Sequence, residues 1–108
     1  MTTDRYVCVA ARRELERDSA IEVRVGAYDV ALFDVGGELF AIENSCPHQG
    51  GPLVEGSVEE GVVTCPWHAW RFDLRTGCMT LGDFARVPRF AVQVEAGAIW
   101  ISEEPIER

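Results

Sequence analysis

The most informative stretch of the sequence is residues 44–71, which read NSCPHQGGPLVEGSVEEGVVTCPWHAWR. It contains two short motifs, Cys46-Pro47-His48 and Cys65-Pro66-Trp67-His68, with sixteen residues between His48 and Cys65. The protein has only 2 histidines, and each lies within three residues of a cysteine. Chance explains this arrangement poorly in a chain of 108 residues, so we interpret the two motifs as the halves of one metal site.

The spacing of the two motifs resembles the signature of Rieske proteins, in which two cysteines and two histidines hold a [2Fe-2S] cluster. The resemblance implies that Cys46, His48, Cys65 and His68 are the cofactor-binding and metal-ligating residues of one cluster per chain. Thiolate and neutral imidazole both suit ferric iron. Two thiolates leave the oxidised unit uncharged, which raises its reduction potential above that of an all-cysteine cluster. The implied class is the Rieske-type ferredoxins, which include components of bacterial ring-hydroxylating dioxygenases and resemble the small subunits of nitrite reductases.

The alternative use of two cysteines and two histidines is a zinc site. Zinc fingers usually place the cysteines first and carry the histidines on a helix, whereas His48 is followed by Gln-Gly-Gly-Pro, which does not favour a helix. We therefore favour the cluster. A zinc-binding or cluster-free interaction module is kept as the alternative from another class.

Short β-type segments flank the motifs. Ile21, Val23 and Val25 alternate with polar residues, so they share one face of a strand. The Gly36-Gly37 pair predicts a hairpin turn, because glycine supplies the positive φ that a two-residue turn needs. Further strands are expected at 6–10, 29–35, 38–43 and 90–101, the last folded at Gly97, and one helical turn within 12–18.

These segments predict an all-β fold with an antiparallel β-sandwich or barrel as its base. Glycine and proline recur from Pro47 to Gly77, which indicates an inserted loop-rich subdomain. The Rieske resemblance implies the same division. We expect a single domain over residues 1–108, with the cluster-binding subdomain at about residues 44–84.

Four positions distinguish the chain from high-potential Rieske proteins. The resemblance implies that those proteins have two disulfide-forming cysteines where this chain has Gly51 and Trp67. They also have hydroxyl groups that donate to sulfur where this chain has Trp70 and Phe72. Hydrogen bonds to sulfur stabilise the reduced state, so their absence lowers the potential. We predict a reduction potential at the low end of the Rieske range, on the order of −150 mV.

Other residues near the motifs have two interpretations. Cys8 and Cys78 could be additional ligands, but lone cysteines usually behave as small hydrophobic residues. Trp67 fits an apolar docking rim and simple packing equally well, whereas Trp70 is expected to pack. The acidic residues Glu55, Glu59 and Glu60 could steer a basic partner, although a solvated face is the default interpretation.

Composition limits the partners. The formal net charge is −8, which repels phosphate backbones and argues against nucleic-acid binding. The sequence has neither the basic and apolar start of a signal peptide nor an apolar stretch of membrane-spanning length. We therefore expect a cytoplasmic protein with no membrane partner, and a monomer.

The predicted function is that of a soluble Rieske ferredoxin. It would carry single electrons from a flavin-dependent reductase to a terminal, aromatic-ring-hydroxylating oxygenase, with no catalytic residues of its own. An oxygenase also needs a mononuclear iron bound by two further histidines, and this chain has none left. The leading alternative is the small subunit of an assimilatory nitrite reductase.

Overall fold

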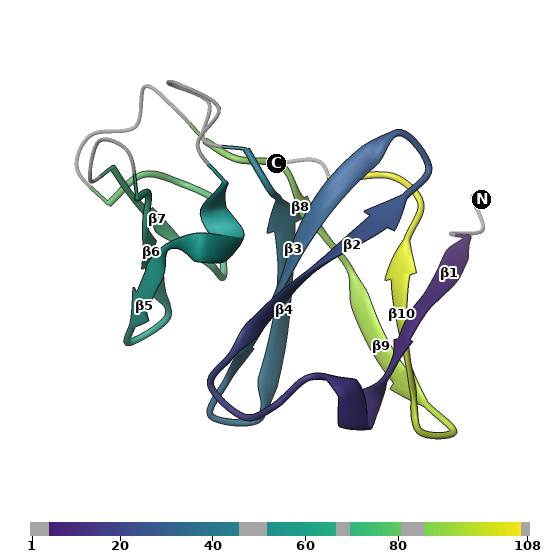
Figure 1. Ribbon diagram of the computed structural model, residues 1–108. Coiled ribbons are helices and arrows are strands. Elements are labelled where there is room, and N and C mark those ends of the chain that lie inside the picture. Colours follow the sequence, from purple (N-terminus) through teal and green to yellow (C-terminus); the bar gives the residue numbers. More distant parts are fainter. Residues whose placement is uncertain (1–4, 46–51, 67–69, 81–85, 107–108) are drawn as a thin grey trace.

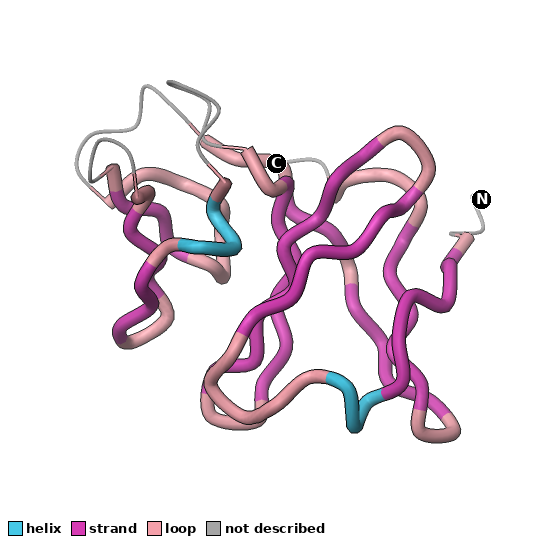
Figure 2. The backbone as a smooth tube through the Cα atoms, in the orientation of Figure 1, coloured by secondary structure: helices cyan, strands magenta, loops and turns pink. Residues whose placement is uncertain are grey.

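The computed structural model describes residues 5–45, 52–66, 70–80 and 86–106. The backbone of these residues consists of strands and loops with two short 3-10 helices (Figure 2). The strands are β1 (Tyr6–Ala11), β2 (Ala20–Val25), β3 (Tyr28–Val35), β4 (Glu38–Glu43), β5 (Ser57–Glu59), β6 (Val62–Thr64), β7 (Arg71–Asp73), β8 (Arg89–Phe90), β9 (Val92–Glu95) and β10 (Ala98–Ser102). The helices are η1 (Arg12–Glu14) and η2 (Leu53–Glu55). Within the described ranges, no helix is long and apolar enough to cross a membrane.

The strands form three antiparallel sheets, and Figure 1 shows the four-stranded sheet between the other two. Their strand orders are β1-β10-β9, β2-β3-β4-β8 and β5-β6-β7. The first two sheets pack together and form the base, which confirms the predicted all-β fold with an antiparallel sandwich. Their common core contains Leu15, Val25, Val30, Leu32, Ala41, Phe90, Ile99 and Ile101.

The central strands β3 and β4 are covered on both faces. Along β3, Val30 and Leu32 point into the base core, while Ala31 and Phe33 point into a second core. Both sets are buried, which explains why β3 has an almost continuous apolar sequence instead of an alternating one. The second core joins the base to the segment that carries the predicted metal site.

The third sheet differs from the loop-rich insertion that the sequence suggested. Its strands β5, β6 and β7 have 3 residues each, too short to show a clear period in the sequence. The turn between β5 and β6 is formed by Glu60 and Gly61, both with positive φ (55° and 80°). Three short strands therefore order a segment for which the sequence predicts loops.

The C-terminal hairpin also needs a correction. The sequence places Phe90, Val92 and Val94 on one strand, but the chain leaves the sheet at Ala91. Phe90 pairs with Ala41 in the central sheet, and Val92 pairs with Ile101 in the other sheet of the base. A strand that passes between two packed sheets has to bend, and here the backbone and hydroxyl of Ser102 hydrogen-bond to Ala91 at the bend, both at 3.0 Å.

Candidate metal centre

The first predicted ligand segment (44–54) runs from the end of β4 to η2, and the second (65–70) connects β6 to β7 of the third sheet. Of the four predicted ligands, Cys65 lies within the described residues, and Cys46, His48 and His68 lie outside them. The geometry of the site is therefore defined by Cys65 and by the residues that flank both segments.

Cys65 directly follows β6 and is buried, with 1% of its surface exposed. The side chains around it belong to the second core, which consists of Ala31, Phe33, Ile42, Leu53, Val63, Phe72, Leu74 and Val87. Its thiol is not part of a disulfide. Apolar surroundings that exclude water are a suitable environment for a sulfur ligand of a cluster, and the thiol of Cys65 is free to bind one.

The second ligand segment is closed at its base by the backbone. The N–H of Cys65 donates to the carbonyl of Trp70 at 2.7 Å, and Thr64 pairs with Arg71 where β6 and β7 meet. The motif from Cys65 to His68 therefore occupies the connection between two paired strands. This position suits a short loop that presents ligands at one end of a hairpin.

The first ligand segment is closed by a side chain. The Oδ1 of Asn44 accepts a hydrogen bond of 2.6 Å from the N–H of Val54 in η2. Residues Asn44 and Val54 are ten positions apart, and Cys46 and His48 lie between them in the sequence. Both predicted segments therefore begin and end at fixed points of the fold.

Residues that flank the two segments lie close together. A Cβ atom added at Gly56 would lie 2.2 Å from the carbonyl oxygen of Thr64 and 3.0 Å from the Val63 side chain, so only glycine fits there. Gly56 ends η2, and Thr64 precedes Cys65. This close approach brings the end of the first segment against the start of the second, as one shared site requires.

The donor set and its surroundings fit a [2Fe-2S] cluster. Cys65 supplies a buried and unpaired sulfur, and apolar side chains exclude water around it. Among the residues that the structure describes, no group of three or more His, Cys, Asp or Glu side chains could hold a metal ion elsewhere. The assignment of Cys46, His48 and His68 as the other ligands is untested by the structure and stays a prediction.

The two other described cysteines lie in different surroundings. Cys8 is exposed on β1, opposite Trp100 of β10, so it is not packed in a core as small hydrophobic residues usually are. Cys78 is half-buried, and its N–H donates to Oγ1 of Thr76 at 3.2 Å. Neither cysteine belongs to the buried core that contains Cys65.

The aromatic residues after the second motif have a packing role. Trp70 is half-buried against the second core, and its ring lies 6.5 Å from that of Phe72 at an angle of 46°. Phe72 is fully buried. Packing of Trp70 was predicted from the sequence, whereas Trp67 lies outside the described residues.

The acidic residues Glu55, Glu59 and Glu60 are exposed. Exposure agrees with either a solvated face or a steering role, so the steering role stays a prediction. Sequence reasoning missed the roles of Asn44 and Gly56. A polar residue at the end of an apolar strand and a glycine beside a short helix were the only signals, and both are common.

A small β protein with a buried cysteine at the start of one of two ligand segments, each held at both ends, has the architecture of a small iron–sulfur protein. Comparison with known proteins supports this class. Residues 5–91 match the Rieske [2Fe-2S] domain, so the chain belongs to the Rieske [2Fe-2S] domain family and is of the type that carries a Rieske [2Fe-2S] cluster.

Three relatives show the range of the family. The ferredoxin component of the naphthalene 1,2-dioxygenase system from Pseudomonas aeruginosa is 32% identical over 100 residues, covering 92% of this chain and 96% of the relative. Human apoptosis-inducing factor 3 is 36% identical over 92 residues, which are 82% of this chain. The chain spans 15% of that protein and 24% of the 4beta-methylsterol monooxygenase of Methylococcus capsulatus, to which it is 38% identical.

Two solved structures have the same fold. A chain from the complex of reduced oxygenase and oxidized ferredoxin in carbazole 1,9a-dioxygenase is 28% identical, with a TM-score of 0.86 and coverage of 95% of this chain and 97% of that one. A chain described as the small subunit of an NADH-dependent nitrite reductase from Mycobacterium tuberculosis has a TM-score of 0.87 at 22% identity, covering 94% of this chain and 96% of that one. The second likeness concerns the fold alone.

Proposed function

We propose that this protein is a one-electron carrier of the Rieske ferredoxin type. The observation that supports it best is the alignment with the naphthalene dioxygenase ferredoxin component, which covers 92% of this chain and 96% of the relative. The residues compared here therefore correspond to nearly the whole of a known carrier. When bound, the cluster supplies a one-electron redox couple.

We assign the ligands as Cys46, His48, Cys65 and His68. Cys65 would provide its thiolate from the buried end of β6, where the second core keeps water away. The backbone bond from Cys65 to Trp70 would hold the second segment, and Asn44 would hold the first. The cluster-binding subdomain is proposed to span about residues 44–84 of one domain.

The proposed partners are a flavin-dependent reductase and a terminal oxygenase. The names of one relative and one solved structure support the oxygenase, since the first is a dioxygenase ferredoxin component and the second is an oxygenase–ferredoxin complex. The reductase stays a prediction from the sequence. The cytoplasm, the monomeric state and the absence of nucleic-acid and membrane partners remain predictions from the sequence.

Ligand substitution tests the proposal. We expect Cys65→Ser to lose the visible absorbance of the cluster and most of its two irons and two sulfides per chain. Cys8→Ser is the matched control, because Cys8 is exposed on β1. This variant should retain the full iron content of the wild type. A colourless wild-type protein that contains zinc would refute the proposal, and an unchanged spectrum in the Cys65 variant would refute the ligand assignment.

The nitrite reductase alternative shares the fold, so partner capture distinguishes it. A carrier should copurify with no large subunit and should be reduced by an added flavin-dependent reductase. Stable copurification with a sirohaem-containing subunit would favour the alternative instead.

A further inference from the structure

Asn44 connects three parts of the fold that surround the first ligand segment. It follows β4 and is buried, with 9% of its surface exposed. Its Oδ1 accepts from the N–H of Val54 at 2.6 Å, and its Nδ2 donates to Oε2 of Glu22 at 2.9 Å. Its backbone N–H donates to the carbonyl of Asp29 at 2.8 Å.

The two ends of this connection belong to different layers. Glu22 lies on β2 at the edge of the central sheet, and Val54 lies in η2, which packs on the second core. Leu53, beside Val54, is fully buried, so η2 has little freedom to move once Asn44 holds its amide. The residues between Asn44 and Val54 include Cys46 and His48.

We propose that Asn44 is a positioning residue for the first ligand segment, fixing both of its ends before and after the cluster binds. This inference rests on the proposed function, because it takes Cys46 and His48 as ligands. The energetic reason is entropic: a segment whose ends are already held loses less freedom when its ligands are fixed.

The chemistry of the site suits asparagine. Asn44 accepts from Val54 through Oδ1 and donates to Glu22 through Nδ2, and an amide carries an acceptor and a donor on two separate atoms. Aspartate would keep the bond to Val54 but would face the carboxylate of Glu22 with no proton to donate. Alanine would leave the N–H of the half-buried Val54 without its acceptor.

The first test is the rate at which an iron chelator removes the cluster, followed by visible absorbance. The temperature is chosen so that every variant is folded by circular dichroism. We expect Asn44→Ala to lose the cluster about five- to tenfold faster than wild type. This ratio of rates corresponds to the net free energy of one hydrogen bond. Asn44→Asp should be intermediate. The double variant Asn44→Asp with Glu22→Gln should return to within about twofold of wild type, because the amide introduced on β2 can then donate to the carboxylate introduced after β4.

The matched control is Asp34→Asn, which weakens a buried polar link whose hydrogen bonds go to Arg12, Asp18 and Gly37 and not to Asn44 or Val54. A purely structural role for Asn44 predicts that Asn44→Ala and Asp34→Asn accelerate cluster loss equally once they are compared at equal distance below their melting temperatures. That result, or a wild-type rate in Asn44→Ala, would overturn the inference.

The second measurement does not need the cluster. Hydrogen exchange of the Val54 amide in the apo-protein should be slow in wild type and in the double variant, and at least about fivefold faster in Asn44→Ala. Equal exchange in wild type and Asn44→Ala would overturn the inference. A wild-type protein that binds no iron but has a protected Val54 amide would instead refute the proposed function, while the hydrogen bond between Asn44 and Val54 would still be present.

Discussion

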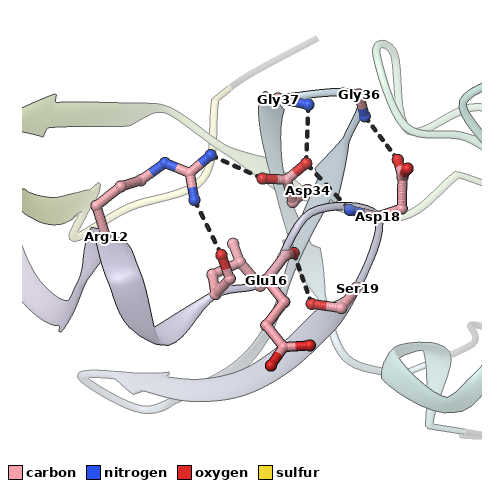
Figure 3. Close-up of polar contacts among 8 residues, drawn as sticks. Arg12, Glu16, Asp18, Ser19, Asp34, Gly36 and Gly37 are labelled. Carbon is pink, nitrogen blue, oxygen red and sulfur yellow. Dashed lines mark hydrogen bonds and ion pairs between the residues drawn. The ribbon is translucent and has the colours of Figure 1, made fainter.

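Asp34 is a charged residue in the interior of the base, at the end of β3. Its side chain is 1% exposed and accepts three hydrogen bonds (Figure 3). The donors are Nη2 of Arg12 at 2.7 Å, the N–H of Gly37 at 2.8 Å and the N–H of Asp18 at 3.3 Å. Burial alone would raise the pKa of Asp34, but these donors outweigh it and hold the pKa below its ordinary value of 3.8.

We predict that Asp34→Asn lowers the free energy of unfolding by about 2–3 kcal/mol at pH 7, because two backbone amides and a guanidinium lose a charged acceptor. Urea denaturation measures this loss. The matched control is Asp29→Asn, which removes an exposed ion pair with Arg24 (3.4 Å) and should cost under about 1 kcal/mol. Equal losses in the two variants would contradict the role assigned to Asp34.

The same carboxylate predicts a pH dependence. Its pKa is depressed in the folded chain, so its contribution is fully present above the unfolded pKa of about 3.8–3.9 and is lost as pH falls through the lower, folded value. Stability of the wild-type base should therefore drop below about pH 4, and the difference between wild type and Asp34→Asn should shrink there. A difference that is constant from pH 7 to pH 3 would contradict this assignment.

At the scale of elements, two glycine turns with the same backbone conformation have different surroundings. Gly77 (φ 76°) follows β7 and Gly97 (φ 74°) joins β9 to β10. A Cβ at Gly77 would lie 2.3 Å from the carbonyl oxygen of Val87, whereas one at Gly97 would meet nothing within 4 Å. The pair therefore separates the cost of a positive φ from the cost of a close approach.

We predict that Gly97→Ala costs about 1–2 kcal/mol, the cost of the left-handed conformation. Gly77→Ala should cost about 1–3 kcal/mol more, because Val87 belongs to the second core and has to move. Thermal and urea unfolding of both variants measure the difference. Similar losses in the two variants would show that Val87 gives way without cost.

The elements that sequence reasoning found are those with a local signal. The alternation in β2 and the Gly36-Gly37 turn depend on neighbouring residues alone, so both were predicted. The strands of the third sheet and the bend at Ala91 depend on contacts between distant parts of the chain. Strands of three residues have no period that reveals such contacts, so these features became visible only in the fold.

For the whole molecule, the central sheet has two functions at once. One face of β3 and β4 completes the core of the base, and the other face supports the segment that holds Cys65. The candidate site could be predicted from the two motifs, since ligand type and spacing are local properties. Its support by Asn44 and Gly56 could not, because Val54 and Thr64 reach them only through folding.

A potentiometric titration of the purified protein, followed by EPR of the reduced cluster, tests the central claim most directly. We predict a rhombic signal from one cluster per chain that appears with a one-electron Nernst curve at a midpoint on the order of −150 mV. A clearly positive midpoint would contradict the low-potential carrier that Trp70 and Phe72 indicate. The absence of any signal from the iron-loaded protein would contradict the Rieske carrier itself.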